Sequence, residues 1–297
     1  MSKILVGTSG YSYKGWNSRT IPNKTGFYTK GGTGSLKQYA EHFKFVELNA
    51  TFYRIPSEKT VEKWVQETPD DFKFVVKVNK GITHTKKMTD WNNLFPQFYE
   101  VMALLGDKLE GFLIQLPPSF ANTNRHSSVD KLTPLERLVS ISEFNLEHYP
   151  GIDFFVEFRH PTWFCDQVYE ALVGKISIVI VNLNNQHGGF SKMKSGFSPP
   201  IHDFPKCLTI PGTIMFRNHG TWETEPYCGE YTDEDLMTMV SLFQDKTVIS
   251  FDNTDSFQFQ IPCPIPGKHM FSSQFQFKGQ ILPHAIADAK RILQIIS

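Results

Sequence analysis

Short apolar runs recur along the whole chain, and the segments between them carry apolar residues at the three- and four-residue spacing of a helix face. Turn-forming residues bound the runs, as is typical of buried strands. The pattern predicts eight strands, at residues 3–7, 43–48, 72–78, 111–116, 153–158, 176–181, 213–218 and 246–251. Strands that alternate with helices in this way indicate repeated β-α units and a parallel sheet.

Capping residues mark several of the intervening helices. Ser35, Ser57 and Thr232 stand where helices should begin, because a hydroxyl oxygen can accept a hydrogen bond from the free N–H groups of a first helical turn. Gly106 and Gly174 stand where helices should end, since glycine readily adopts the left-handed conformation of a closing residue. These positions predict helices in the segments between strands.

Two segments depart from the repeat. Residues 184–211 are predicted to form an irregular loop after the sixth strand, in place of much of a helix. Residues 281–296 predict a final amphipathic helix. Its apolar face consists of Ile286, Ala289, Ile292 and Ile295.

Eight parallel strands favour an α/β fold of the (β/α)8 TIM-barrel type, whose closed sheet leaves no edge exposed. The 297 residues suit one such domain spanning residues 1–297. An open doubly wound sheet is the alternative. It is less favoured because GTSGYSYKGW, at residues 7–16, lacks the glycine spacing of a dinucleotide-binding turn.

Composition narrows the class of ligand. Thirty Lys and Arg residues balance thirty Asp and Glu residues, so the formal net charge is zero. A chain without a basic excess has no overall field to hold a nucleic-acid duplex by counterion release, so any anion must bind at a local site. The cysteines form no C-x-x-C pair, which argues against a zinc ribbon or a disulfide framework.

The sequence also bears on location. The first ten residues run directly into the first predicted strand, and nowhere do eighteen apolar residues follow one another. We therefore expect a soluble, cytoplasmic protein without membrane partners.

Polar side chains stand at the carboxyl ends of the predicted strands. Three strands end in two polar residues that lie two positions apart and therefore share a face. These pairs are Glu47 and Asn49, Glu157 and Arg159, and Arg217 and His219. Other strands contribute Lys77, Gln115, Asn182, Asp252 and Asn253 at similar depth. Because the carboxyl ends of barrel strands surround one open mouth, these residues predict a functional site there.

Structural salt bridges between the same side chains are the alternative interpretation. Glu47 or Glu157 would then merely neutralise Arg159 or Arg217. For any single pair the two interpretations are equally supported. Taken together the residues favour function, because burying so many polar groups for stability alone is costly.

Six stretches, in order along nearly the whole chain, match one known family. They are GTSGYSYKGW (7–16), FVELNATFYRIPSEKTVEKWVQETPDDFKFVVKVNKGITH (45–84), QLPPSF (115–120), EFRHPTWF (157–164), RNHG (217–220) and FDNT (251–254). They resemble the YecE-like proteins, known as domain of unknown function 72. The resemblance implies a TIM barrel with a structural likeness to the endonuclease IV and xylose isomerase type barrels, and it brings no established reaction.

Two features depart from the family pattern. The family tends to read F-N-N at the end of the last strand, where this chain has Phe251, Asp252 and Asn253. The chain also carries an added segment, 255–280, before the final helix. This segment could cover the site, mediate an oligomer or be a variable excursion, and the last is the default interpretation.

The first functional hypothesis is an enzyme acting on a phosphorylated or otherwise anionic substrate. By analogy with nuclease-like barrels, the first reaction to test is phosphodiester hydrolysis of a nucleotide or nucleic acid. Two arginines would clamp the anion, a glutamate would be the general base, and His219 would be acid or base. The catalytic candidates are Glu47, Glu157, His219 and Asp252. The substrate-binding candidates are Asn49, Tyr53, Lys77, Gln115, Arg159, Trp163, Arg217 and Asn253.

The second hypothesis is a protein that binds nucleotides, nucleic-acid fragments or sugar phosphates without catalysis. Aromatic rings after the strand ends could stack on bases or sugars. They are Tyr11, Tyr13, Trp16, Phe52, Tyr53 and Trp163. Large aromatics are usually buried, so Trp16 and Phe52 are expected to pack loops onto the rim. The third hypothesis is a metal-dependent sugar isomerase or epimerase.

A divalent metal is not favoured, although no cofactor can be assigned. Donor side chains are present, but none lies in a tight motif such as H-E-x-x-H. The donors are His84, His160, His219, Glu47, Glu157 and Asp252.

Overall fold

Eight parallel strands close into a barrel, in which each strand pairs with its neighbours in sequence and β8 pairs with β1. The computed structural model describes residues 2–13, 16, 27–28, 35–123, 132–181, 204–221, 229–252, 271–277 and 280–297. The barrel strands are β1 (Lys3–Ser9), β2 (Phe45–Leu48), β3 (Lys73–Lys77), β4 (Leu109–Gln115), β5 (Asp153–Glu157), β6 (Ser177–Val181), β7 (Thr213–Asn218) and β8 (Lys246–Phe251). All eight predicted strands, and the closed barrel that they predict, are confirmed.

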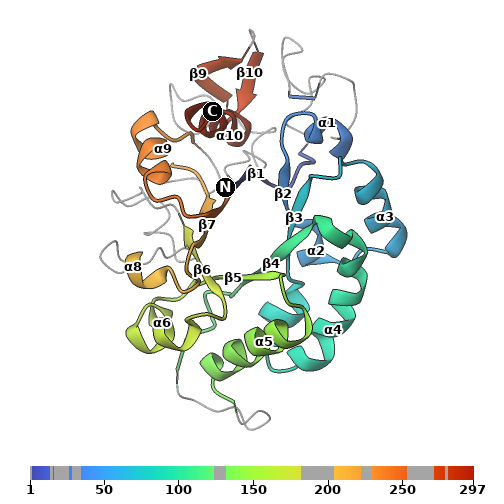
Figure 1. Cartoon of the computed structure of the whole chain (residues 1–297), viewed down its shortest axis with the longest axis vertical. Helices are drawn as coiled ribbons and strands as arrows, with labels where there is room; N and C mark the ends of the chain where they lie inside the picture. Colours follow the sequence, from blue (N-terminus) through green and yellow to red (C-terminus); the bar gives the residue numbers. More distant parts are fainter. Residues whose placement is uncertain are drawn as a thin grey trace.

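Helices surround the barrel on the outside (Figure 1). The α-helices are α1 (Leu36–Ala40), α2 (Ala50–Tyr53), α3 (Glu58–Gln66), α4 (Trp91–Met102), α5 (Pro134–His148), α6 (Asp166–Leu172), α8 (Phe204–Cys207), α9 (Asp233–Val240) and α10 (His284–Ile295). A π-helix, η2 (Gly81–Thr85), and two 3-10 helices, η3 (Ala103–Lys108) and η4 (Pro161–Trp163), complete them. In the described part of the chain, no helix combines the length and apolar character needed to cross a membrane.

The structure confirms the predicted starts of α1, α3 and α9 and the predicted end of α6 next to Gly174, whereas α4 ends at Met102 and Gly106 lies inside η3. The Ser35 hydroxyl accepts a hydrogen bond from the first turn of α1, and Thr232 completes a capping box at the start of α9. Ser57 occupies the N-cap of α3 without a side-chain bond. Gly106 and Gly174 have φ angles of 56° and 72°, in the left-handed region that glycine adopts without strain.

The interior of the barrel is filled by one apolar layer. It consists of Leu5, Phe45, Val75, Leu113, Phe155, Val179, Val181, Met215 and Val248. The alternate residues of the strands face outward and join a larger core with the helices. Because inward-facing positions recur every two residues, the next ones toward the carboxyl ends lie at the mouth.

Three parts of the chain differ from the prediction. Residues 204–207 form the short helix α8 inside the segment predicted as irregular. Ile295 is 41% exposed, so the apolar face of α10 ends at Ile292, one turn earlier than the spacing suggested. Within the added segment, β9 (Phe271–Phe277) pairs antiparallel with β10 (Gln280–Pro283), and this small sheet packs against α10 (Figure 1).

Two of the predicted polar positions fall outside the part of the chain that the structure describes. Asn182 and Asn253 lie outside the described residues, together with most of the segments 184–211 and 255–280.

Candidate functional site at the mouth of the barrel

A layer of polar side chains lies directly above the apolar layer of the barrel. Six strands place a polar residue two positions after an apolar-layer residue, on the same inward face. These residues are Glu47, Lys77, Gln115, Glu157, Arg217 and Ser250. The strand register sets Ser9 opposite Glu47 and Gln115 opposite Glu157. The fold therefore brings residues from distant segments to one end of the barrel.

Arg217 is at the centre of this polar layer and is fully buried. Its guanidinium group holds Glu47 with two hydrogen bonds, Nε to Oε2 at 2.8 Å and Nη2 to Oε1 at 2.7 Å. Nη1 donates to Glu157 Oε2, and Nη2 also lies 3.2 Å from Asp252 Oδ2. With a further contact of 3.3 Å from Nη1 to His219 Nε2, the five N–H donors of the guanidinium are all engaged.

Burial and neighbouring charge act in opposite directions on these groups. Burial alone would raise the pKa of Glu157, but the guanidinium groups of Arg159 and Arg217 outweigh it and hold that pKa well below its usual range. Burial likewise acts to lower the pKa of Arg217, but the surrounding carboxylates raise it well above its ordinary value. Both groups therefore stay ionised at neutral pH.

His219 is a neutral imidazole inside the same network. Its Nε2 atom faces Arg159 Nη2 at 3.1 Å and Arg217 Nη1 at 3.3 Å, and its Nδ1 atom lies 2.9 Å from Asp252 Oδ2. Because guanidinium N–H groups only donate, Nε2 must accept, and Nδ1 carries the proton toward the carboxylate. Burial lowers the pKa of His219, and the two arginines reinforce that effect against the attraction of Asp252.

Lys77 has different surroundings from the arginines. Its amine makes no hydrogen bond or ion pair within the described part of the chain, and it lies 4.6 Å from the centroid of the Phe52 ring. Burial, followed by the nearby charge of Arg217, lowers the pKa of Lys77 to about 8 against the opposite effect of three carboxylates. The lysine is thus close to releasing its proton at physiological pH.

Helix α2 follows β2 at once and carries two aromatic rings to the side of the mouth where Lys77 lies. Phe52 and Tyr53 meet edge to face at 5.1 Å, and Tyr53 is 69% exposed. The amine of Lys80, which lies between β3 and η2, is 5.8 Å from the Tyr53 ring centroid. The His84 ring packs against Phe52 at 4.8 Å. Burial, followed by the charge of Lys77, lowers the pKa of His84 to about 4, so this imidazole is neutral.

Two amide side chains retain hydrogen-bonding capacity near the mouth. Asn49 donates from Nδ2 to Ser9 Oγ, which in turn donates to Glu47 Oε1 at 2.7 Å. The buried Oδ1 atom of Asn49 has no partner among the described residues. The half-buried side chain of Gln115 likewise has no hydrogen bond to the described part of the chain.

The sequence of the chain identifies its family. The family described as "Protein of unknown function DUF72" matches residues 5–258. The chain belongs to this family. The UPF0759 protein YecE of Escherichia coli (strain K12) is 33% identical to it over 162 residues, which are 54% of this chain and 50% of YecE. YunF of Bacillus subtilis (strain 168), also a UPF0759 protein, is 30% identical over 173 residues, 56% of this chain and 54% of YunF.

The DUF72 chain spans about half the length of the curated relatives that it matches. Solved structures resemble this chain over a longer part of its sequence. A DUF72 family protein of Thermotoga maritima MSB8 has a TM-score of 0.62 and 24% identity, with 99% of each chain covered. One from Enterococcus faecalis V583 has a TM-score of 0.62 and 18% identity, covering 100% of this chain and 98% of the other. At these identities the likeness shows the shared barrel fold.

One predicted ligand-binding residue of this DUF72 protein does not belong to the mouth. Trp163 is completely buried, its indole N–H donates to the Phe120 carbonyl at 2.6 Å, and its ring stacks on Phe158 at 4.9 Å. The expectation of an exposed ring was therefore wrong, because η4 turns Trp163 into the core. Trp16 is also fully buried, as expected for a ring that packs a loop.

Sequence reasoning missed Ser9, although the same rule of alternate positions could have found it. It shares the inward face of β1 with Leu5, and its hydroxyl links Asn49 to Glu47. His84 was considered only as a metal donor, whereas it lines the wall beside Phe52. In the described part of the chain, no group of three or more His, Cys, Asp or Glu side chains is arranged to hold a metal ion.

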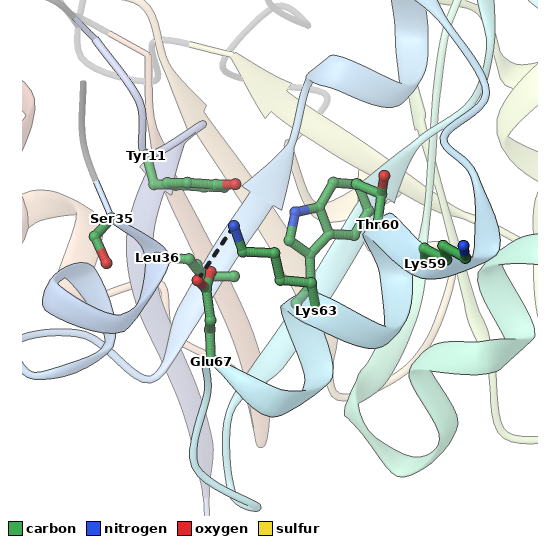
Figure 2. Close-up of a pocket in the computed structure, with 8 residues that line it drawn as sticks. Tyr11, Ser35, Leu36, Lys59, Thr60, Lys63 and Glu67 are labelled. Atoms are coloured by element: carbon green, nitrogen blue, oxygen red, sulfur yellow. Dashed lines mark ion pairs between the residues drawn. The ribbon is translucent and has the colours of Figure 1, made fainter. Parts of the chain in front are cut away.

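A pocket lies between α3 and the start of α1 (Figure 2). Its volume is about 480 Å³. It is lined by Tyr11, Ser35, Leu36, Lys59, Thr60, Lys63, Trp64 and Glu67. Lys63 and Glu67, four residues apart along α3 and its C-cap, form an ion pair of 3.7 Å at the pocket (Figure 2). Paired surface charges of this kind are common, so we place the candidate site at the mouth of the barrel instead.

Proposed function

We propose that this protein is an enzyme that acts on a small anionic substrate at the mouth of its barrel, with Lys77 as the cation that contacts the anion. The observation that carries the proposal is the distribution of partners among the cations. Arg217 has given all its donors to protein groups, whereas Lys77 and Lys80 have no carboxylate within ion-pair distance in the described part of the chain.

The geometry changes the roles that the sequence suggested for the arginines. Arg159 donates to Glu157 and Arg217 binds three carboxylates, so both hold the carboxylates in place and would have to give up those bonds to clamp a substrate. Separating a buried ion pair is costly. An anion gains more from Lys77, whose charge has no close partner, and the amides of Asn49 and Gln115 can orient it.

Phosphodiester hydrolysis remains the first reaction to test, on the analogy with nuclease-like barrels. Both candidate general bases are held by arginines. Glu157 accepts hydrogen bonds from both arginines and has a low pKa, which makes it a weak base in this arrangement. Glu47 is held by two hydrogen bonds from Arg217 and would act as base only after one of them opens.

Binding without turnover is the second candidate function. The exposed ring of Tyr53 next to Lys80 favours it, because aromatic faces beside cations suit the base and phosphate of a nucleotide. Both candidates require Lys77, and they differ in turnover. If the protein binds nucleotides and leaves them unreacted in the presence of divalent metals, its function is binding without turnover.

The test is a screen of phosphomonoesters and phosphodiesters with Mg²⁺, Mn²⁺ and Zn²⁺, combined with calorimetric titration of inorganic phosphate. Lys77→Met is expected to weaken phosphate binding about 10- to 100-fold, the worth of a hydrogen bond to a charged group. Lys44→Met is the matched control, since Lys44 is an exposed lysine at the amino end of β2. Equal affinities in the two variants would overturn the proposal.

A further inference from the structure

The amine of Lys77 is unusual among the lysines that the barrel encloses. Lys108 donates to the carbonyl oxygens of Val65 and Thr68, both at 2.8 Å. Lys246 lies 2.5 Å from carboxylate oxygens of Glu110 and Asp153. Enclosed ammonium groups need such partners because desolvation otherwise disfavours the charge. Lys77, by contrast, makes no hydrogen bond or ion pair through its amine in the described part of the chain, and the face of the Phe52 ring lies 4.6 Å from it.

We propose that the amine of Lys77 is a nucleophile, and that the substrate carries a carbonyl group with which Lys77 condenses. This inference rests on the proposed function, because it needs the substrate to contact Lys77 at the mouth. It adds the substrate class: an anionic aldehyde, ketone or 2-oxo acid. Amines that lie in apolar surroundings beside other cations are the ones that proteins use in this way.

Burial and the charge of Arg217 favour the neutral amine of Lys77 that the reaction needs, and three carboxylates oppose them. The ionised groups that face it are Arg217, Glu47, Asp252 and Glu157, and the His84 ring beside Phe52 is neutral. The three carboxylates are each occupied by arginine, which weakens their hold on the ammonium form. With its pKa lowered from 10.5 to about 8, Lys77 has roughly 200-fold more neutral amine at pH 7.5 than an ordinary lysine.

The condensation is balanced without an oxidant or reductant. The ammonium group first releases one proton to water, and the lone pair of Nζ then forms a bond to the carbonyl carbon. The carbonyl oxygen takes up that proton and one from the nitrogen, and it leaves as water. The sum is ammonium plus carbonyl giving iminium plus water. Added cyanoborohydride delivers a hydride to the iminium carbon and converts the adduct to a stable secondary amine.

The experiment exposes the full chain to pyruvate or to dihydroxyacetone phosphate with cyanoborohydride, and then locates the adduct by peptide mass spectrometry. Labelling of Lys77 is expected to exceed labelling of Lys44 by about tenfold or more, given the larger fraction of neutral amine. The rate at Lys77 should rise with pH and level off above about 8. Labelling spread evenly over exposed lysines would overturn the inference.

Variants separate this inference from the proposed function. Lys77→Arg keeps the positive charge but has no amine, so it should bind inorganic phosphate and lose the adduct, whereas Lys77→Met should lose both. If wild-type protein shows no adduct while Lys77→Met loses phosphate binding, the nucleophile is refuted and the anion site stands. If Lys77 is labelled but phosphate neither binds nor slows labelling, the nucleophile stands and the anionic substrate is refuted. The competition with phosphate uses wild-type protein, so it is informative even where a variant misfolds.

Discussion

Arg217 on β7 and Glu47 on β2 share two parallel hydrogen bonds across the mouth of the barrel, 170 residues apart in the sequence. The pair joins the two halves of the chain inside a region without solvent, since both side chains are fully buried. An intact buried pair of this kind contributes little net stability. Removing one of its two partners is strongly destabilising, because the other charge stays buried without a counter-charge.

Removal of the Arg217 charge should therefore destabilise the fold strongly. Arg217→Met leaves Glu47, Glu157 and Asp252 without their shared partner, and we expect the free energy of unfolding to fall by about 3–5 kcal/mol. Chemical denaturation at pH 7 measures the change. Arg54→Met, at an exposed arginine, is the control and should change stability by less than about 0.5 kcal/mol. Equal losses of unfolding free energy in the two variants would show that leaving the carboxylates without Arg217 does not destabilise the fold.

Acid should weaken the network through Glu157. Its pKa is lowered in the folded state, so its contribution to stability is complete above the unfolded value of about 4.5 and is lost as the pH falls through the lower folded value. We expect the wild-type free energy of unfolding to fall with pH below about 4.5. Glu157→Gln should lessen this dependence. Urea denaturation between pH 3 and pH 7 measures both slopes, and identical slopes would contradict the assignment.

The imidazole of His84 should report on the charge of Lys77. Burial and that charge lower the pKa of His84 to about 4, so its NMR titration midpoint should lie near 4 rather than 6.5. Lys77→Met removes the charge and should move the midpoint upward, while Lys44→Met should leave it in place. A midpoint unaffected by Lys77→Met would mean that the two side chains are not electrostatic neighbours.

Trp163 should act on stability and not on ligand binding. Trp163→Phe removes the indole N–H that binds the Phe120 carbonyl and leaves that oxygen buried without its donor. We expect the free energy of unfolding to fall by about 1–3 kcal/mol. Calorimetric titration should give the same phosphate affinity as wild type. A large loss of phosphate affinity in a variant with unchanged stability would show that Trp163 contributes to ligand binding.

The barrel could be predicted because each strand is recognisable from its own short segment of sequence. Each strand is a short apolar run, and a side-chain period of two assigns Glu47, Glu157 and Arg217 to the inward face without any knowledge of the partner strands. The same reasoning predicts that polar residues meet at the carboxyl ends, since parallel strands share one direction.

The partners within the site were not predictable. Periodicity predicts that Arg217 faces inward, but only the closed sheet shows that its guanidinium group meets the carboxylates of Glu47, Glu157 and Asp252. The prediction for Trp163 failed for a similar reason, because the turn of η4 rather than strand parity sets the direction of its side chain. The lowered pKa of Lys77 reflects burial first and then the charge of Arg217, which lies 140 positions further along the sequence (217 − 77 = 140).

The closed ring of strands also has a consequence for how the chain is made. Glu47 and Glu157 leave the ribosome before Arg217, so a nascent chain holds two acidic groups with no counter-charge from β7 until most of the protein has emerged. Acidic groups in that state remain hydrated and oppose compaction of the first five strands. We therefore expect closure of the barrel to wait until β7 and Arg217 have been synthesised.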